Sequence, residues 1–104
     1  MGQYRIDFES FPWEVLGPGW RQKVLVQNGR KLRLVEFTPE FVETDWCRKR
    51  HLGYVLEGEV EIDLNGTVER FRAGDGVFIP GGEESKHMLK VSSGTARLFL
   101  IEDT

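Results

Sequence analysis

Two histidines and a single cysteine, His51, His87 and Cys47, are the side chains of this chain best suited to bind a metal ion or to move a proton. Imidazole and thiolate groups bind zinc and other first-row metals, and imidazole also titrates near neutral pH. Residues two apart in an extended strand face the same side, so Cys47 and His51 share a face. His87 shares its face with Leu89 and Val91, which are apolar and therefore predict an inward direction.

Each of these residues also has an ordinary structural interpretation. A histidine in the wall of a sheet can donate a hydrogen bond to a backbone carbonyl, and a free cysteine often packs as a small hydrophobic group. The run Arg48-Lys49-Arg50 is typical of a solvated edge, although Lys49 has the parity of Cys47 and His51 and could hold an anion. Trp46 and Tyr54 could stack on a ligand, or they could be packing residues.

Short runs of alternating residues predict strands throughout the chain, with turns between them. Asn28-Gly29 and Asn65-Gly66 are strong signals of two-residue hairpin turns. No window has the apolar spacing of a helix, so we expect at most a short helical turn within residues 1–19. The predicted strands are 4–8, 21–27, 31–38, 52–56, 59–64, 67–72, 77–80, 86–91 and 95–101.

The length of 104 residues and mass of 12.0 kDa fit one domain. About nine or ten short antiparallel strands predict an all-β sandwich or barrel. We expect residues 1–19 to form an N-terminal strand and an aromatic cover, and residues 20–104 to form the barrel.

Charge and apolar patterning exclude several classes of protein. Lys and Arg total 14 against 17 Asp and Glu, a net charge of −3, which argues against a nucleic-acid partner. No apolar run approaches the roughly 18 residues of a membrane span, and the N-terminus does not resemble a secretory signal. One cysteine cannot form an internal disulfide, so we expect a cytoplasmic protein with no membrane partner.

Two segments resemble the motifs of the cupin superfamily. Residues 53–62, Gly-Tyr-Val-Leu-Glu-Gly-Glu-Val-Glu-Ile, resemble the end of the first motif, G-x5-H-x-H-x3-4-E-x6-G. Residues 73–82, Ala-Gly-Asp-Gly-Val-Phe-Ile-Pro-Gly-Gly, resemble the start of the second, G-x5-P-x-G-x2-H-x3-N. The resemblance implies a single-domain cupin fold, a jelly-roll β-barrel.

The resemblance also implies positions for metal ligands, and this sequence departs from the family pattern there. Asp45 and Cys47 stand at the two histidine positions of the first motif, and His51 stands at its glutamate position. Ser85 stands at the histidine position of the second motif, with His87 two residues later. Asp45, Cys47, His51 and His87 would form a site for a divalent metal, with zinc favoured and iron, nickel or manganese as alternatives. Asp45 could equally be a turn residue.

Two classes of function follow from these positions. In the first, a metal held by these four residues acts on a small molecule inside the barrel, and an anion is one candidate for that molecule. In the second, a metal-free binding module or isomerase uses His51 or His87 as an acid–base group, and a ligand-sensing module is a further alternative. The candidate ligand-binding residues are Lys49, Tyr54, Ser85 and Lys86. The sequence leaves open whether the protein is an enzyme.

The face opposite His51 predicts self-association. Leu52, Tyr54 and Leu56 form an apolar stripe that needs a cover. Phe8, Phe11 and Trp13 of the same chain could supply it. Because cupins commonly pair two barrels, we expect a homodimer in which residues 4–38 pack on a partner sheet that includes Leu52–Leu56.

Overall fold

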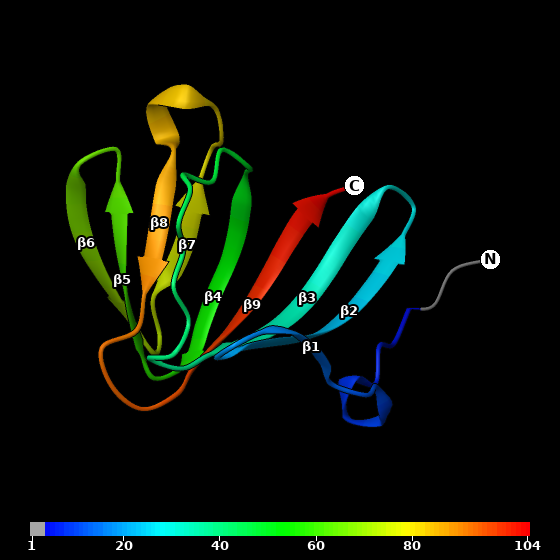
Figure 1. Cartoon of the computed structure of the whole chain (residues 1–104). Coiled ribbons are helices and arrows are strands. Elements are labelled where there is room, and N and C mark those ends of the chain that lie inside the picture. The colour runs from blue at the N-terminus through cyan, green and yellow to red at the C-terminus, as the bar shows by residue number, and fades with distance from the viewer. Residues whose placement is uncertain (1–3) are drawn as a thin grey trace.

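The structure, a computed structural model, describes residues 4–104, and this part of the chain is built from short strands and two single-turn 3-10 helices (Figure 1). The elements in chain order are η1 (Phe8–Ser10), β1 (Glu14–Gly17), β2 (Trp20–Gln27), β3 (Arg30–Phe37), β4 (His51–Glu57), β5 (Glu59–Leu64), β6 (Thr67–Arg72), β7 (Gly76–Ile79), η2 (Glu83–Ser85), β8 (His87–Lys90) and β9 (Ala96–Asp103).

The strands form two antiparallel sheets, which confirms the all-β jelly-roll prediction. The larger sheet has the order β1-β2-β3-β9-β4-β7, and the smaller one has the order β6-β5-β8. Figure 1 shows the smaller sheet facing the β4 and β7 end of the larger one, with residues 38–50 running beside β8. The C-terminal strand β9 lies between β3 and β4 and so joins the two halves of the larger sheet.

The two hairpin signals are confirmed. Asn28 and Gly29 have φ angles of 50° and 74°, and Asn65 and Gly66 have φ angles of 49° and 102°. Two consecutive positive φ angles are what a type I′ turn requires, and that turn matches the twist of the strands that it joins. The turns fix the registers of β2 with β3 and of β5 with β6, with Gln27 opposite Arg30 and Leu64 opposite Thr67.

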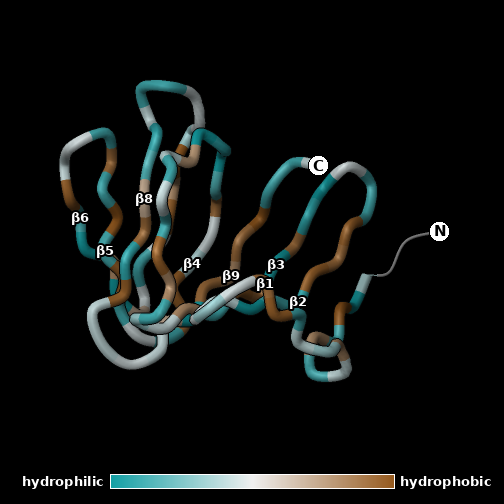
Figure 2. The backbone as a smooth tube through the Cα atoms, in the orientation of Figure 1, coloured by the Kyte–Doolittle hydropathy of each residue, from teal (hydrophilic) through white to brown (hydrophobic). Residues whose placement is uncertain are grey.

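The hydrophobic core lies between the two sheets. Val35, Val55 and Leu98 of the larger sheet are almost fully buried, as are Val60 and Ile62 of the smaller one. Figure 2 shows hydrophobic stretches along the strands of both sheets and hydrophilic colour at the hairpin tips. Burial of this face stabilises the barrel by roughly 25 cal/mol for each Å² of apolar area removed from water.

The predicted strand at residues 4–8 is wrong. Tyr4 is 96% exposed, and Phe8–Ser10 form the 3-10 turn η1, closed by the Ser10 hydroxyl, which donates to the Asp7 carbonyl at 2.9 Å. A segment becomes a strand only by pairing with a neighbour, and residues 4–8 pair with no described strand. The outer edge of β2 is already occupied by β1, which pairs Glu14 with Gln22.

The N-terminal segment covers only part of the outer face of the larger sheet. The Phe8 ring packs edge-on against Phe99 of β9 at 6.1 Å, and Trp13 lies under the Arg21 guanidinium at 4.1 Å. Tyr54 and Phe78, farther along the same face, stay exposed. Within residues 4–104 no helix is long and apolar enough to cross a membrane.

Candidate metal centre and cavity

Cys47 and His87 are placed side by side by backbone pairing. The Cys47 N–H donates to the His87 carbonyl at 2.8 Å, and the His87 N–H donates to the Cys47 carbonyl at 2.9 Å. This reciprocal pair is an isolated antiparallel bridge, in which directly opposite residues share a face. The loop of residues 38–50 therefore presents the Cys47 thiol beside the His87 ring, which opens β8.

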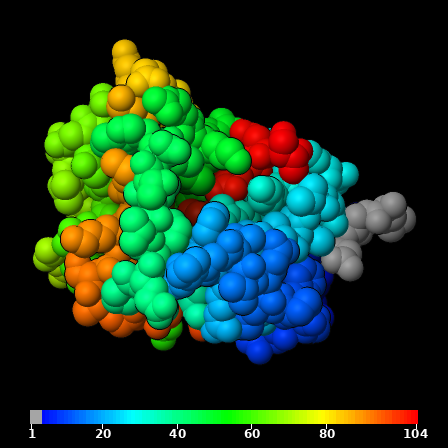
Figure 3. Space-filling model, in the orientation of Figure 1, coloured from blue at the N-terminus to red at the C-terminus, as the bar shows by residue number. Residues whose placement is uncertain are grey.

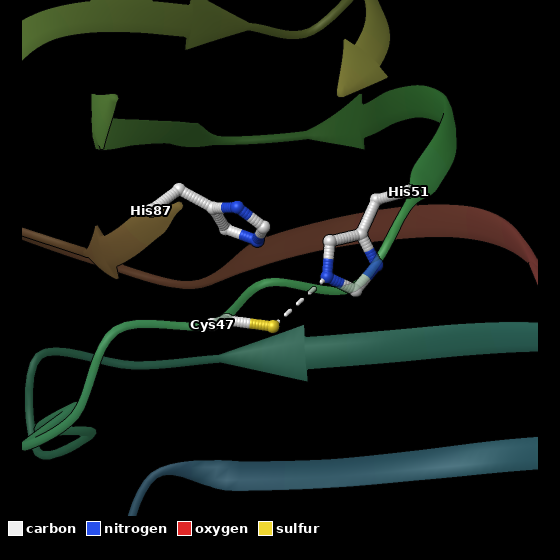
Figure 4. A group of neighbouring side chains, drawn as sticks. All are labelled: Cys47, His51 and His87. Carbon is white, nitrogen blue, oxygen red and sulfur yellow. Dashed lines mark hydrogen bonds between the residues drawn. The ribbon is translucent and has the colours of Figure 1, made fainter. Parts of the chain in front are cut away.

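His51 completes the cluster from the facing sheet. It is the first residue of β4, and its ring centroid lies 4.9 Å from that of His87. Its Nε2 atom lies 3.5 Å from the Cys47 Sγ atom. The ligand atoms of the three residues lie within 4.8 Å of one another, and Figure 4 shows the three side chains converging. This cluster, Cys47–His51–His87, could hold a metal ion.

The Nδ1 atom of each histidine is engaged outside the cluster, so the Nε2 atom is the one that faces the cluster. His87 Nδ1 donates to the Ser85 carbonyl at 3.0 Å, and His51 Nδ1 donates to Glu102 Oε2 at 2.5 Å. Metal-binding histidines typically make this second contact to a carbonyl or carboxylate, because it fixes the tautomer. Among the described residues, His87 Nε2 is buried without a hydrogen-bond partner, which is costly in a folded protein. The donor set and this atom fit a metal ion.

Charge within the cluster favours a thiolate beside an imidazolium. The hydrogen bond with His51, and then the nearby His87 ring, lower the pKa of Cys47 to about 5. Burial disfavours the charged form of His51, but its contacts with Cys47 and Glu102 outweigh burial and raise its pKa to about 9. The pKa of His87 is also raised, because Cys47 and the Ser85 carbonyl outweigh burial. The thiolate is the form of cysteine that binds metals.

A cavity of about 570 Å³ opens beside the cluster, within the range of small-molecule sites, about 300–1,000 Å³. Its apolar wall includes Phe37, Ile79 and Leu98, and Cys47, His51 and His87 form part of its polar wall. Figure 3 shows a hollow between the loop of residues 38–50 and the N-terminal strands, with β9 in dark red at its floor. The arrangement places three ligand atoms next to space for a small molecule.

The sequence matches the model of the family described as Cupin domain, Cupin_2, over residues 35–102. That range spans β4 to β8 and all but the last residue of β9, and it holds all three residues of the cluster. The chain belongs to the Cupin_2 family. None of the curated protein sequences matches this cupin significantly.

Solved cupins with the same fold differ widely in function. An RmlC-like cupin from Shewanella frigidimarina NCIMB 400 aligns with a TM-score of 0.80 and 19% identity, covering 98% of this chain and 91% of the other. The polyketide cyclase RemF from Streptomyces resistomycificus aligns with a TM-score of 0.76 and 24% identity, covering 98% of this chain and 80% of the other. A sugar phosphate isomerase from Silicibacter pomeroyi aligns with a TM-score of 0.77 and 14% identity, covering 96% of this chain and 75% of the other. At these identities the likeness shows the fold alone.

The other predicted site residues of this cupin differ in whether they line the cavity. Asp45 and Lys49 line the cavity, but the Asp45 carboxylate does not join the three converging ligand atoms. Ser85 takes part through its backbone carbonyl. Lys86 lies over the Trp46 ring at 5.2 Å and pairs with Glu83, and Lys86 is not part of the cavity wall.

Tyr54 lies away from the cavity, on the outer face of β4, because it is an odd number of residues from His51 along the strand. It is 47% exposed there. Its place fits the apolar outer stripe rather than a ligand-stacking role.

Sequence reasoning missed several polar residues of the cavity wall, among them Glu102, Arg33 and Glu43. Glu102 and Arg33 form an ion pair at 2.9 Å, and Glu43 accepts a hydrogen bond from the Leu89 N–H at 2.7 Å. Burial raises the pKa of Glu43. Alternation could have found Glu102 and Arg33, since each continues the inward face of its strand. Glu43 stands in an irregular loop, where no period indicates its direction.

Proposed function

We propose that this cupin holds one divalent transition metal at Cys47, His51 and His87 and uses it to bind a small molecule in the adjacent cavity. The observation that carries the proposal is the buried Nε2 atom of His87, which has no partner in the described chain and lies in the three-residue cluster. A thiolate with two imidazoles favours zinc, with iron or nickel next, whereas manganese prefers oxygen ligands.

The chain's own residues would prepare the site in defined ways. Glu102 orients the His51 ring, and the Ser85 carbonyl orients the His87 ring. Three protein ligands are typical of sites that keep a coordination position for water or substrate. A metal bound there would supply Lewis-acid polarisation of a carbonyl or carboxylate, or a more acidic bound water. The apolar wall would exclude bulk water from the bound molecule.

A metal-free alternative rests on the hydrogen bonds of His51. Its Nδ1 atom is held by Glu102, and its Nε2 atom lies 3.5 Å from the Cys47 thiol at the cavity wall. A histidine oriented by a carboxylate can transfer a proton at the opposite nitrogen. In this alternative the cupin is a small-molecule binding module or an isomerase, with His51 or His87 as the acid–base group.

Cobalt substitution separates the two functions. Protein stripped with a chelator is titrated with Co²⁺, and the near-ultraviolet spectrum is recorded. We expect a thiolate-to-cobalt charge-transfer band that is lost in Cys47→Ser, because only a coordinated sulfur produces it. Lys90→Gln, an exposed lysine outside the cavity wall, is the matched control and should keep the band. No band in the folded wild-type protein would favour the metal-free alternative.

A further inference from the structure

The inner face of the larger sheet carries a row of charged residues that starts at the cluster. Lys31 of β3 is the register partner of Glu102 of β9. On the other side of β9, the pairing of Leu52 with Ile101 places His51 beside Glu102. His51 and Lys31 are therefore two strands apart, a backbone separation of about 10 Å. Figure 1 shows the three strands β4, β9 and β3 side by side.

Arg33, two residues from Lys31 on the same face, has an unused Nη2 group. Its side chain is 12% exposed. Its Nε atom donates to Gln22 at 2.7 Å, and its Nη1 atom donates at 2.9 Å to Glu102 Oε2, the oxygen that His51 also contacts. Within residues 4–104, Nη2 makes no hydrogen bond. The Nη2 group of this partly buried guanidinium is therefore left to donate to an oxygen of a further carboxylate.

The two lysines of the cavity wall also lack acidic partners. Neither Lys31 nor Lys49 forms an ion pair with any described residue. The wall holds three cations and three acids, namely Lys31, Arg33, Lys49, Glu43, Asp45 and Glu102. Its total charge is therefore small, although Glu102 is already paired with Arg33 and His51. This balance suits a singly charged carboxylate better than a doubly charged phosphate.

We propose that the cavity binds a small organic acid attracted by the cations Lys31, Arg33 and Lys49 of its wall, with its carboxylate on Lys31 and Arg33 and an oxygen group at its other end directed to the Cys47–His51–His87 cluster. Only the contact of the oxygen group with the cluster rests on the proposed metal function. The row from Lys31 to His51 spans two strand spacings, or about 10 Å between backbones, so a small acid can lie along it.

The test uses three probes with one carbon skeleton: succinate, succinamate and neutral succinamide. Binding is measured by calorimetry with zinc-loaded and with chelator-treated protein, and the zinc content of every sample is determined. Inorganic phosphate is a fourth probe. The variants are Lys31→Gln and Lys49→Gln, which leave the Arg33–Glu102 pair intact, and Lys90→Gln is the control outside the wall.

We expect succinate and succinamate to bind zinc-loaded protein and succinamide to bind at least about tenfold more weakly, the loss typical of one charged hydrogen bond. Lys31→Gln and Lys49→Gln should each weaken the binding of succinamate by about fivefold to tenfold and leave the zinc content unchanged. Lys90→Gln should bind succinamate as wild type does. Equal affinity for succinamide and succinamate, or tighter binding of phosphate, would overturn the carboxylate assignment.

The zinc measurements separate this inference from the metal proposal. Zinc uptake with no discrimination among the three probes would refute the organic acid and leave the metal site intact. Carboxylate binding that depends on Lys31 and Lys49 in protein that takes up no zinc would support the carboxylate contact and refute the metal function on which the second contact rests.

Discussion

The reactivity of the Cys47 thiol reports directly on the state of the cluster. Because its pKa is lowered to about 5, the zinc-free protein should hold a thiolate at neutral pH and react readily with iodoacetamide. Zinc should protect the thiol, so we expect chelator to raise the labelling rate. In His51→Ala the first cause of the lowered pKa is lost, so labelling of the zinc-free protein at pH 7 should slow.

Two outcomes of the labelling experiment would contradict these roles of Cys47 and His51. A rate that chelator does not change would show that Cys47 is a packing residue rather than a ligand. A zinc-free rate that rises with pH only near pH 9, the ordinary value, would show that His51 does not stabilise the thiolate. Labelling of the unfolded protein serves as the reference for an unperturbed thiol.

Glu102 should act as a positioning residue for His51. Glu102→Gln removes the charge that pairs with both Arg33 and His51, so we expect zinc affinity to fall by about 10- to 100-fold. Breaking a buried pair should also lower the free energy of unfolding by about 3–5 kcal/mol. Competition with a coloured chelator measures the first quantity, and urea unfolding measures the second.

Glu36→Gln is the matched control for this substitution. Glu36 is a buried carboxylate of the same sheet, held by Arg21 and Arg97 on the opposite face. Its loss should reduce stability but leave zinc affinity at the wild-type value. An equal loss of zinc affinity in both variants would assign the effect of Glu102 to general destabilisation.

At the scale of one strand, Gly53 allows β4 to lie against β9 and so sets the position of His51. A Cβ atom at Gly53 would stand 2.0 Å from the Phe99 carbonyl oxygen, a backbone atom that cannot move aside cheaply. We expect Gly53→Ala to lower the unfolding free energy by at least about 2 kcal/mol, the range of strained core substitutions, and to weaken zinc binding. Urea unfolding and zinc titration check both effects.

Gly76→Ala is the control for the strand prediction. Gly76 lies in the neighbouring strand β7, where an added Cβ would meet only the Gly53 carbonyl at an ordinary 3.8 Å. Its stability should change by less than about 1 kcal/mol. If Gly53→Ala were equally harmless, the close approach of β4 to β9 would not be what positions His51.

The strands illustrate what the sequence could predict. The alternation of apolar and polar residues and two Asn-Gly turns were enough to predict the strands β2 to β9. Strand parity indicated the inward direction of His51 and His87. Their convergence with Cys47 needed the pairing of a loop residue with β8, which has no local signal. The strand predicted at residues 4–8 is wrong for a similar reason, because whether a segment finds a strand to pair with is a property of the folded sheet.

At the scale of the whole molecule, we propose a homodimer through the outer face of β4 and β7. Leu56 and Phe78 are exposed there beside Tyr54, and the N-terminal segment of the same chain packs instead near β9. Phe78 is 77% exposed, which is unusual for an aromatic residue in water. An obligate interface of this kind buries about 2,000 Å² or more.

Light scattering should therefore give twice the 12.0 kDa mass of one chain. Phe78→Glu should shift the mass to that of one chain, because a charge would be buried in the interface. Val68→Glu, at a 60% exposed position on β6 of the other sheet, should leave the mass unchanged. A wild-type protein that stays at 12.0 kDa over a wide range of dilution would contradict the dimer.

Zinc titration of the chelator-treated protein shows whether Cys47, His51 and His87 bind one metal together. We expect about one zinc per chain, with Cys47→Ala and His87→Ala folded but unable to retain it after dialysis, and Lys90→Gln retaining it as wild type does. A folded wild-type protein that retains no zinc, iron or nickel, or a His87→Ala variant that retains as much metal as wild type, would contradict this shared binding.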